Sequence, residues 1–406
     1  RLFLEVPNRG RKLLNGQLNR AAASPTPTRE IPAGDGFLYR RGYAVGWIGW
    51  QWDVVRSDAL MGLEPPIAQQ DGKPISGQIA LRFQPSQAHT VHLLADRVHH
   101  PYPAADTDEA DATLTVRDFD DDAPRIIPRD QWRFAREEGG SLVPDTEHFW
   151  LDGGFVPGKI YELVYTTSHS PVVGAGLLAI RDIASFLKYD ATPENPLAGA
   201  LDFAYGFGVS QDGRLLRHFL SLGLNLDEEG RQVFDGLMPH VGGGRRGEFN
   251  HRFAQPSVQY TPGFGHLGPF DDASLLERQR ELGGCPKVIQ TNSSAEYWRG
   301  DCALTHIDSD GSRDLPPDPE TRIYHFAGTQ HGPGGLPLHR ENAADGAKGR
   351  YWFNTLDYTP LLRAALVNLD TWVRGGDAPP ESAHPRLADG TAVSRATALD
   401  GVPPIP

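Results

Sequence analysis

A single serine stands among glycines where a strand-like segment gives way to a helix-like one. Residues 206–214 read Gly-Phe-Gly-Val-Ser-Gln-Asp-Gly-Arg, and the helix-like stretch 214–220 follows directly. Glycine-rich turns between a strand and a helix hold a serine hydroxyl in an exposed position, where a neighbouring base can remove its proton. Ser210 is therefore our candidate nucleophile for acyl-transfer chemistry.

The motif around Ser210 departs from the usual Gly-x-Ser-x-Gly pattern. Asp212 occupies the place of the second glycine, which moves to Gly213. Isolated Gly-x-Ser-x-x-Gly strings are common, and such a serine can simply cap a helix. The catalytic interpretation therefore depends on finding partners for the serine elsewhere in the chain.

A serine nucleophile needs a histidine as its base and a carboxylate that orients the histidine. On parallel-sheet hydrolases these residues follow the order serine, acid, histidine, each just past a strand. The strand-like residues 286–290 lead into a loop in which Glu296 is the only carboxylate, and the strand-like residues 322–327 run into His331. We therefore predict a catalytic triad of Ser210, Glu296 and His331.

Other acids and histidines nearby remain open as alternatives. They are Asp301 and Asp308 for the acid, and His306, His325 and His339 for the base. His325 falls inside the predicted strand, where it would face a core or a neighbouring helix. His339 follows a glycine-proline loop that could return it to the site.

Hydrolysis of an acyl group also needs two backbone N–H groups that bind the developing oxyanion. The residue after the nucleophile supplies one of them, which here is Gln211. For the other we predict Arg9, in the Asn-Arg-Gly turn after the first strand, with Trp50 and Gln51 as the second choice. Trp50 and Trp298 are also predicted to bind substrate, and filling the core is an equally weighted alternative for such tryptophans.

The remaining segments alternate between strand-like and helix-like patterns, which is typical of a parallel sheet with crossover helices. The strand-like segments before the serine are 2–6 and 43–50, and the helix-like segments are 36–42, 175–187 and 359–374. Residues 71–167 consist instead of short alternating runs divided by Pro, Gly and Asp, the pattern of a small all-β unit. We predict an α/β core of residues 1–70 and 168–406 with a β-rich insertion at 71–167.

Residues 239–275 are predicted to form a long loop or lid over the site. Its stretch Gly-Gly-Gly-Arg-Arg-Gly at 242–247 is expected to be flexible and solvated, with binding of a substrate carboxylate or phosphate as the alternative. The acidic clusters at 106–111 and 118–122 lack the spacing of a calcium loop, so we expect solvated loops there. We predict neither a metal site nor a cofactor.

Composition restricts the partners. The chain of 406 residues carries 39 Lys and Arg against 52 Asp and Glu, a formal net charge of −13 that argues against binding nucleic acid or anionic membranes. No apolar run is long enough to span a membrane.

The chain has only two cysteines, Cys285 and Cys302, which are too few for a usual zinc site. A local disulfide and two free thiols are both compatible with their positions. We expect a small-molecule ligand and make no prediction of oligomeric state.

The first residue is Arg1, and a strand-like segment follows it at once. A chain that starts in this way without methionine favours a leader or an N-terminal segment that has been removed or left out. The resulting expectation is a soluble protein of the periplasm or the extracellular space.

Several segments of the chain resemble a bacterial family of α/β-hydrolase-domain proteins. They include Gly208-Val-Ser-Gln-Asp-Gly, Asn292-Ser-Ser-Ala-Glu-Tyr-Trp and Phe326-Ala-Gly-Thr-Gln-His, together with residues 5–10, 42–50, 181–187, 225–227 and 372–380. The resemblance covers nearly the whole chain and implies the α/β-hydrolase fold, with a mostly parallel sheet and with Ser210, Glu296 and His331 as the triad. The stretch Phe234-Asp-Gly is also loosely similar to tannase and feruloyl esterase relatives.

These patterns predict a serine hydrolase that cleaves carboxylic esters through an acyl-enzyme intermediate. Two alternatives remain open. One is a peptidase or amidase with the same triad, and the other is a catalytically inactive module whose β-rich part binds carbohydrate.

Overall fold

A six-stranded sheet forms the centre of the structure, a computed structural model that describes residues 1–24, 26–27, 29–258, 267–299, 301–342, 347–400 and 402. Its strands, in spatial order, are β17 (Thr321–Phe326), β16 (Lys287–Ser293), β15 (Gly236–His240), β14 (Ala204–Val209), β1 (Leu2–Val6) and β2 (Ala44–Trp47). Every neighbouring pair is parallel. The carboxyl ends of all six strands therefore lie at one edge, and the expected α/β architecture is confirmed.

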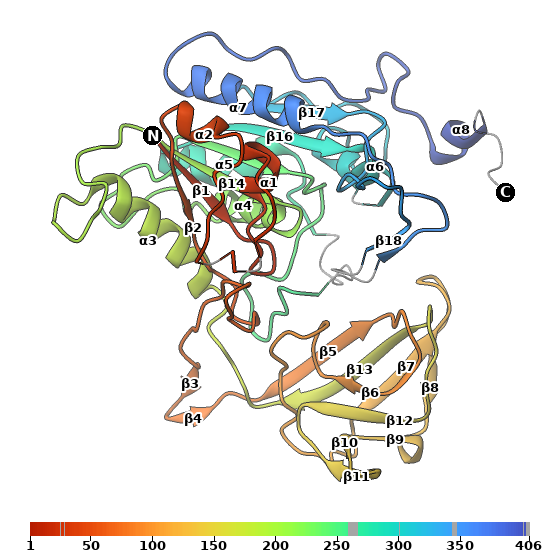
Figure 1. The fold of residues 1–406 in the computed structure, drawn as a ribbon. Helices are drawn as coiled ribbons and strands as arrows, with labels where there is room; N and C mark the ends of the chain where they lie inside the picture. Colours follow the sequence, from red (N-terminus) through yellow and green to blue (C-terminus); the bar gives the residue numbers. More distant parts are fainter. Residues whose placement is uncertain are drawn as a thin grey trace.

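Both faces of the sheet are buried, and alternate side chains of each strand enter two different cores (Figure 1). In β1, Leu2, Leu4 and Val6 pack against α3 (Ala175–Tyr189) and α4 (Gln211–Ser221). Phe3 points to the opposite face, toward α7 (Thr359–Val373). Strands buried on both faces are near-continuous apolar runs, which explains why these segments were recognisable as strands.

Four further helices pack around these layers: α1 (Leu14–Asn19), α2 (Phe37–Arg40), α5 (Asp272–Leu282) and α6 (Ser294–Arg299). Helix α8 (Arg395–Asp400) has no buried residue and lies near the C-terminus, away from the sheet. Two 3₁₀ segments, Arg129–Gln131 and Cys302–Thr305, and the short pair β18 (Glu341–Asn342) and β19 (Ala347–Lys348) lie outside the main sheet.

The chain winds outward from β1 in two directions. It first runs from β1 to β2 on one side, and after a long excursion it returns to β14, on the other side of β1. In open parallel sheets this reversal opens a crevice at the carboxyl edge, and ligands bind there. The turns that follow β1 and β14 therefore flank the natural position for a site.

The excursion between β2 and β14 contains a separate set of antiparallel strands, drawn below the parallel sheet in Figure 1. They are β3 (Gln69–Gln70), β4 (Lys73–Pro74), β5 (Gly77–Phe83), β6 (His89–Leu93), β7 (Thr113–Arg117), β8 (Arg125–Ile127), β9 (Trp132–Arg133), β10 (Ala135–Glu138), β11 (Ser141–Pro144), β12 (His148–Phe155) and β13 (Ile160–Thr167). A four-stranded and a three-stranded sheet enclose a core rich in aromatic rings. The inserted all-β region is therefore present as expected.

The predicted long loop 239–275 contains parts of two regular elements. His240 ends β15, Asp272 begins α5, and residues 259–266 lie outside the described part of the chain. The segment between β15 and residue 258 joins the two parts of the molecule, since the carbonyl of Ala254 accepts hydrogen bonds from Tyr102 at 2.8 Å and Trp52 at 3.2 Å. That this segment covers the site stays a prediction.

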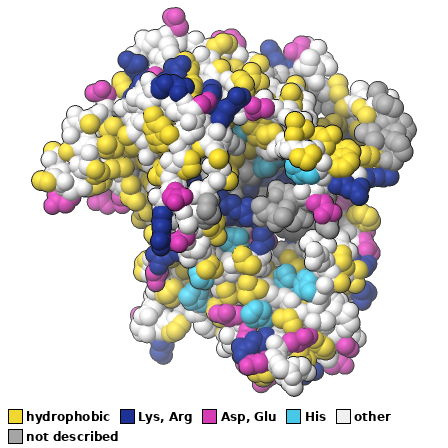
Figure 2. Space-filling view, viewed as in Figure 1, with side chains coloured by type: hydrophobic (Ala, Val, Ile, Leu, Met, Phe, Trp, Pro, Cys, Tyr) yellow, Lys and Arg dark blue, Asp and Glu magenta, His cyan; other side chains and the backbone are white. Residues whose placement is uncertain are grey.

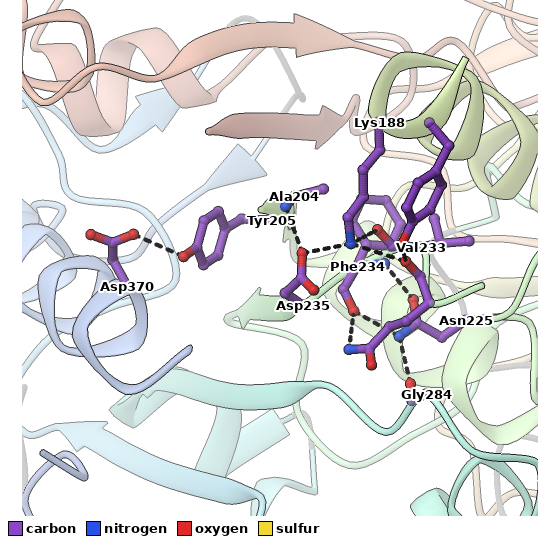
Figure 3. A network of polar contacts seen from close by, with 11 residues as sticks. Lys188, Ala204, Tyr205, Asn225, Val233, Phe234, Asp235, Gly284 and Asp370 are labelled. Atoms are coloured by element: carbon purple, nitrogen blue, oxygen red, sulfur yellow. Dashed lines mark hydrogen bonds and ion pairs between the residues drawn. The ribbon is translucent and has the colours of Figure 1, made fainter. Parts of the chain in front are cut away.

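A polar network holds the sheet at the opposite, amino-terminal edge (Figure 3). Asp235, which precedes β15, accepts hydrogen bonds from Lys188 and from the N–H of Ala204, both at 2.8 Å. Tyr205 donates to Asp370 on α7 at 2.8 Å. These contacts connect both helical layers to the start of β14.

Asn225 is the second centre of this network and is fully buried. Its side chain exchanges two 2.8 Å hydrogen bonds with the backbone of Phe234 and donates a third to the carbonyl of Gly284. Two of the segments that carry the family resemblance, 225–227 and 234–236, therefore have a structural role, far from the carboxyl edge.

Candidate active site

The turn between β14 and α4 holds Ser210 in an unusual backbone conformation. Its φ of 62° and ψ of −110° define a region that costs a non-glycine residue about 1–3 kcal/mol. Both sides of the residue are held, because its N–H donates to the His240 carbonyl at 2.8 Å and its carbonyl accepts the Arg214 N–H at 3.1 Å. A strained serine in such a turn has the geometry of a nucleophile elbow.

Two glycines allow β14 and α4 to approach closely. A Cβ atom on Gly208 would lie 2.5 Å from the carbonyl oxygen of Asp212, and one on Gly213 would lie 2.9 Å from the carbonyl oxygen of His240. Both obstacles are backbone atoms, which cannot rotate away. The displaced second glycine therefore has a clear role, since it lets α4 pack against the end of β15.

Gly208→Ala should lower both stability and activity. Its new methyl group must displace the backbone of α4, and overpacking of this kind costs about 1–3 kcal/mol. We expect a lower urea midpoint and slower hydrolysis, because Ser210 moves with α4. Gly16→Ala in α1 is the control, because nothing lies within 4 Å of its Cβ position. Wild-type stability of Gly208→Ala would contradict the close packing.

His331 and Glu296 form a hydrogen-bonded pair. The imidazole Nδ1 lies 2.5 Å from Oε1 of Glu296. Glu296 is in the first turn of α6, directly after β16, and its side chain is only 4% exposed, whereas that of His331 is 35% exposed. Because Nδ1 faces the acid, Nε2 is the ring nitrogen left for a substrate or a nucleophile.

The environment of Glu296 favours its ionised form. Burial alone would raise the pKa of Glu296, but the hydrogen bonds from His331 and from Ser293 outweigh burial and hold the pKa below its usual 4.5. Ser293 contributes both its N–H, at 2.9 Å, and its hydroxyl, at 2.5 Å. Glu296 is therefore a fixed carboxylate at neutral pH, as the orienting acid of a triad must be.

Side chains from the segment before α7 and from the start of α6 hold the loop that carries His331. Tyr358 donates to the His331 carbonyl at 3.0 Å, and Asn354 donates to the carbonyl of Gly328 at 2.6 Å. Ser294, next to β16, accepts the Gly328 N–H at 3.0 Å. These contacts fix the position of His331 relative to the end of β16, in addition to its connection to β17.

Ser210, Glu296 and His331 follow β14, β16 and β17 at the carboxyl edge of the sheet. The structure joins the histidine to the acid, whereas Ser210 Oγ and the imidazole are not hydrogen-bonded to each other. Catalytic hydrogen bonds are often long in ligand-free enzymes and tighten when substrate binds. The assignment of these three residues as a triad stays a prediction.

His240 links the two halves of the site and was missed by the sequence analysis. It ends β15, between β14 and β16, and is fully buried, with its Nδ1 2.8 Å from Thr291 Oγ1. Burial lowers the pKa of His240 to about 3, and the charges of Glu296 and His331 are the next influences on it. Its backbone therefore holds Ser210 while its neutral ring lies near the acid and base.

The competing acids and histidines are engaged elsewhere. Asp301 pairs with Arg245, and Asp308 with Arg313 and Ser312. The three histidines have other partners: His306 contacts the Tyr297 hydroxyl, His325 contacts the Ser294 hydroxyl, and His339 contacts the Pro337 carbonyl. Within the described chain, none of these histidines contacts a carboxylate as His331 does.

The predicted oxyanion donors, Gln211 and Arg9, contact each other. Gln211 is the first residue of α4, so its N–H has no partner within the helix. Its side-chain Oε1 accepts the backbone N–H of Arg9 at 3.2 Å, while its Nε2 donates to Gln51 at 3.1 Å. The Arg9 N–H is therefore aimed at the turn after Ser210, but it already donates to a side chain.

The two tryptophans predicted to bind substrate lie in different environments. Trp50 is only 2% exposed and packs edge-on against Phe249, at 5.6 Å between ring centres, so it fills the core. Trp298 is 54% exposed on α6, two residues after Glu296. Of the two, only Trp298 presents surface to a ligand, and its role stays a prediction.

The glycine-rich stretch is not a solvated loop at its start, contrary to expectation. Residues 242–244 are buried against α4, where Gly243 accepts a hydrogen bond from Arg217 at 3.0 Å and donates one to Asn292 at 3.1 Å. Glycine is favoured here because a Cβ on Gly242 would lie 3.2 Å from the backbone carbon of Gly213, and one on Gly244 would lie 2.4 Å from the Asp301 carbonyl oxygen. The stretch thus supports the turn that holds Ser210.

Exposed apolar side chains gather on the loop between β17 and α7. They are Leu336, Leu338, Tyr351, Trp352 and Leu356. Figure 2 shows hydrophobic side chains concentrated over this region. Since the same loop carries His331, an apolar surface is available beside the candidate base.

Cys285 and Cys302 are both free thiols, which decides between the two alternatives left by their spacing. Among the described residues, no group of three or more His, Cys, Asp or Glu side chains is arranged to hold a metal ion. None of the helices in the described ranges is long and apolar enough to cross a bilayer.

Three features define the α/β-hydrolase class: a doubly wound parallel sheet, a strained serine between strand and helix, and a histidine–carboxylate pair at the same edge. The family model for the alpha/beta hydrolase domain matches residues 156–402, more than half of the chain. The chain belongs to this family and is a hydrolase. No curated protein and no solved structure matches it significantly.

The family match begins after β1 and β2, yet both strands belong to the same sheet as β14. The β-rich excursion separates them from the matched part in sequence but not in space. The turn after β1, with Arg9, therefore completes an edge at which Ser210, Gln211, Glu296 and His331 lie within the match.

Proposed function

We propose that the protein is a serine hydrolase that cleaves carboxylic esters through an acyl-enzyme intermediate. The observation that carries this proposal is the 2.5 Å contact between His331 and Glu296, at the sheet edge that also bears Ser210. The strained φ of 62° at Ser210 adds support, because such strain is concentrated at functional sites.

In the proposed reaction, Ser210 Oγ attacks the acyl carbon while Nε2 of His331 takes its proton. The imidazolium that forms is stabilised by Glu296 through Nδ1. His331 then returns the proton to the leaving alcohol, and the acyl group stays on Ser210. A water molecule deprotonated by His331 attacks this intermediate and releases the acid.

The developing oxyanion would be bound by the N–H of Gln211, at the amino end of α4, where the helix dipole also favours negative charge. We assign the second donor to the N–H of Arg9. That N–H now donates to Oε1 of Gln211, so the substrate oxygen would take the place of this side-chain oxygen.

A panel of 4-nitrophenyl acyl esters and the matching 4-nitroanilides tests the reaction class. We expect the esters to be cleaved and the anilides to be cleaved at least about 100-fold more slowly. Faster cleavage of the anilides would favour a peptidase or amidase. Absence of all turnover, together with no labelling of Ser210 by a fluorophosphonate, would favour an inactive binding module.

A further inference from the structure

Arg214 lies one helical turn after Ser210 and has an unusual environment. Its side chain is partly accessible to solvent, yet burial lowers the pKa of its guanidinium to about 10. The guanidinium is therefore largely desolvated but can still be reached from solvent. Residues four apart on a helix are neighbours, so Arg214 lies next to the turn that holds Ser210.

The guanidinium of Arg214 has no hydrogen bond and no ion pair within the described chain. Nearby charges do not compensate its positive charge. The largest charge effects on the pKa of Arg214 come from Arg9, which lowers this pKa, and from Asp212, which raises it. Arg299, which is exposed at the end of α6, lowers it further, and the charge of Glu296 raises it. Arg9 and Arg299 are thus both close enough to Arg214 for their charges to act on it.

The other two arginines are also without a carboxylate partner. Arg9 donates to two neutral oxygens, the Ser257 carbonyl at 2.9 Å and Asn8 Oδ1 at 3.2 Å. No ion pair within 4.0 Å joins Arg9 or Arg299 to any described acid. Figure 2 shows basic side chains inside the hollow between the parallel-sheet core and the β-rich part.

Asp96 and Asp53 also act on the charge of Arg9, whereas the two acids near Arg214, which are Glu296 and Asp212, do not neutralise Arg214. Glu296 already accepts hydrogen bonds from His331 and Ser293. Both carboxyl oxygens of Asp212 are buried without a hydrogen-bond partner, and burial raises the pKa of Asp212 well above its usual value. A carboxyl group with a raised pKa carries less negative charge, so Asp212 compensates Arg214 less than an ordinary aspartate would.

We propose that Arg214, with Arg9 and Arg299 beside it, binds a free carboxylate carried by the ester substrate. A guanidinium presents a planar set of N–H donors that matches a carboxylate, and such charge-assisted bonds are the strongest hydrogen bonds in proteins. The amino end of α4 favours an anion at the same place. The substrate class is therefore an ester with a second, ionised carboxyl group.

This inference rests on the proposed ester hydrolase activity and makes the substrate specific. One helical turn rises about 5.4 Å, so a carboxylate a few bonds from the ester carbonyl is the expected match for Arg214. Short half-esters of dicarboxylic acids meet that requirement on the acyl side. Esters of hydroxybenzoic acids meet it on the alcohol side.

Two matched pairs of esters test the proposal in a pH-stat. Ethyl hydrogen succinate against ethyl pentanoate examines the acyl side, and 4-carboxyphenyl butanoate against phenyl butanoate examines the alcohol side. We expect the carboxylate member of one pair to have the higher kcat/KM, by about 10- to 100-fold. Arg214→Met should bring that ratio close to one, and Arg214→Lys should retain part of it.

Arg278→Met on α5 is the matched control, because Arg278 is also an arginine on a core helix but is exposed. It should keep the wild-type ratio. Equal rates within both pairs for the wild type, or the same ratio in Arg214→Met, would overturn the proposal. Circular dichroism of Arg214→Met reports whether the fold is intact.

A binding measurement separates this inference from the proposed activity. Calorimetry with succinate and with uncharged succinamide requires no turnover. We expect succinate to bind the wild type about 10- to 100-fold more tightly than Arg214→Met, and succinamide to bind neither. Cleavage of neutral esters without this succinate binding would refute the inference alone, whereas succinate binding without any ester cleavage would refute only the proposed activity.

Discussion

Replacing Ser210 by alanine should abolish ester hydrolysis, with a loss of about 10⁴-fold or more in kcat/KM. The reason is that no other hydroxyl takes the position at the turn between β14 and α4. The fold should tolerate the change, because Ser210 Oγ makes no hydrogen bond with the described residues and alanine has the same Cβ at φ 62°. We expect the free energy of unfolding in urea to change by less than about 0.5 kcal/mol.

Ser210→Gly and Ser221→Ala are the companion variants. Glycine removes the strain of the positive φ, so Ser210→Gly should be inactive and about 1 kcal/mol more stable than the wild type. Ser221, at the end of the same helix, bonds only to the His218 carbonyl, and its alanine variant should remain active. Near-normal turnover by Ser210→Ala would exclude Ser210 as the nucleophile.

Glu296→Gln should lower kcat by about 10³- to 10⁴-fold while leaving the fold in place. Glutamine is nearly isosteric, but its amide does not carry the charge that stabilises the imidazolium, and it can turn an N–H toward Nδ1 and select the wrong tautomer of His331. Since the pKa of Glu296 lies below its usual 4.5, the wild-type carboxylate is ionised throughout the neutral range. The loss should therefore be present at every pH from 6 to 9.

Comparing Glu296→Gln with Asp308→Asn and Asp301→Asn shows which of the three carboxylates orients His331. Both residues were alternatives in the sequence, and both have arginine partners away from His331. We expect each variant to keep activity within about threefold of the wild type, on the usual scale of surface changes. A larger loss in either of them than in Glu296→Gln would move the acid to that position.

The segments most readily recognised in the sequence were those whose local pattern agrees with their surroundings. The strands β1 and β14 are mostly apolar because both faces of the sheet are covered, and α7 begins with a proline and is closed by glycine as expected. β15 was missed, because its five residues contain a proline and a glycine and resemble a loop. His240 was missed with it.

Burial could not be predicted for Trp50 or for the glycines at 242–244, because burial depends on contacts between segments that are distant in the sequence. The pattern around Trp50 suits a pocket and a core equally well, and only its packing against Phe249 shows that it belongs to the core. The glycines at 242–244 suggest flexibility, yet they are buried because α4 needs a neighbour without side chains. Neither packing partner is near in sequence.

By itself, the sequence determined the class of fold, the β-rich insertion and the order of serine, acid and histidine along the chain, because these depend on local periodicity and on residues next to strand ends. Only the tertiary structure decided that Glu296 contacts His331, that the two cysteines stay apart, and that Arg214 is left without a counter-ion. Pairing of this kind depends on distances between segments far apart in the chain, and these distances exist only after the sheet has formed.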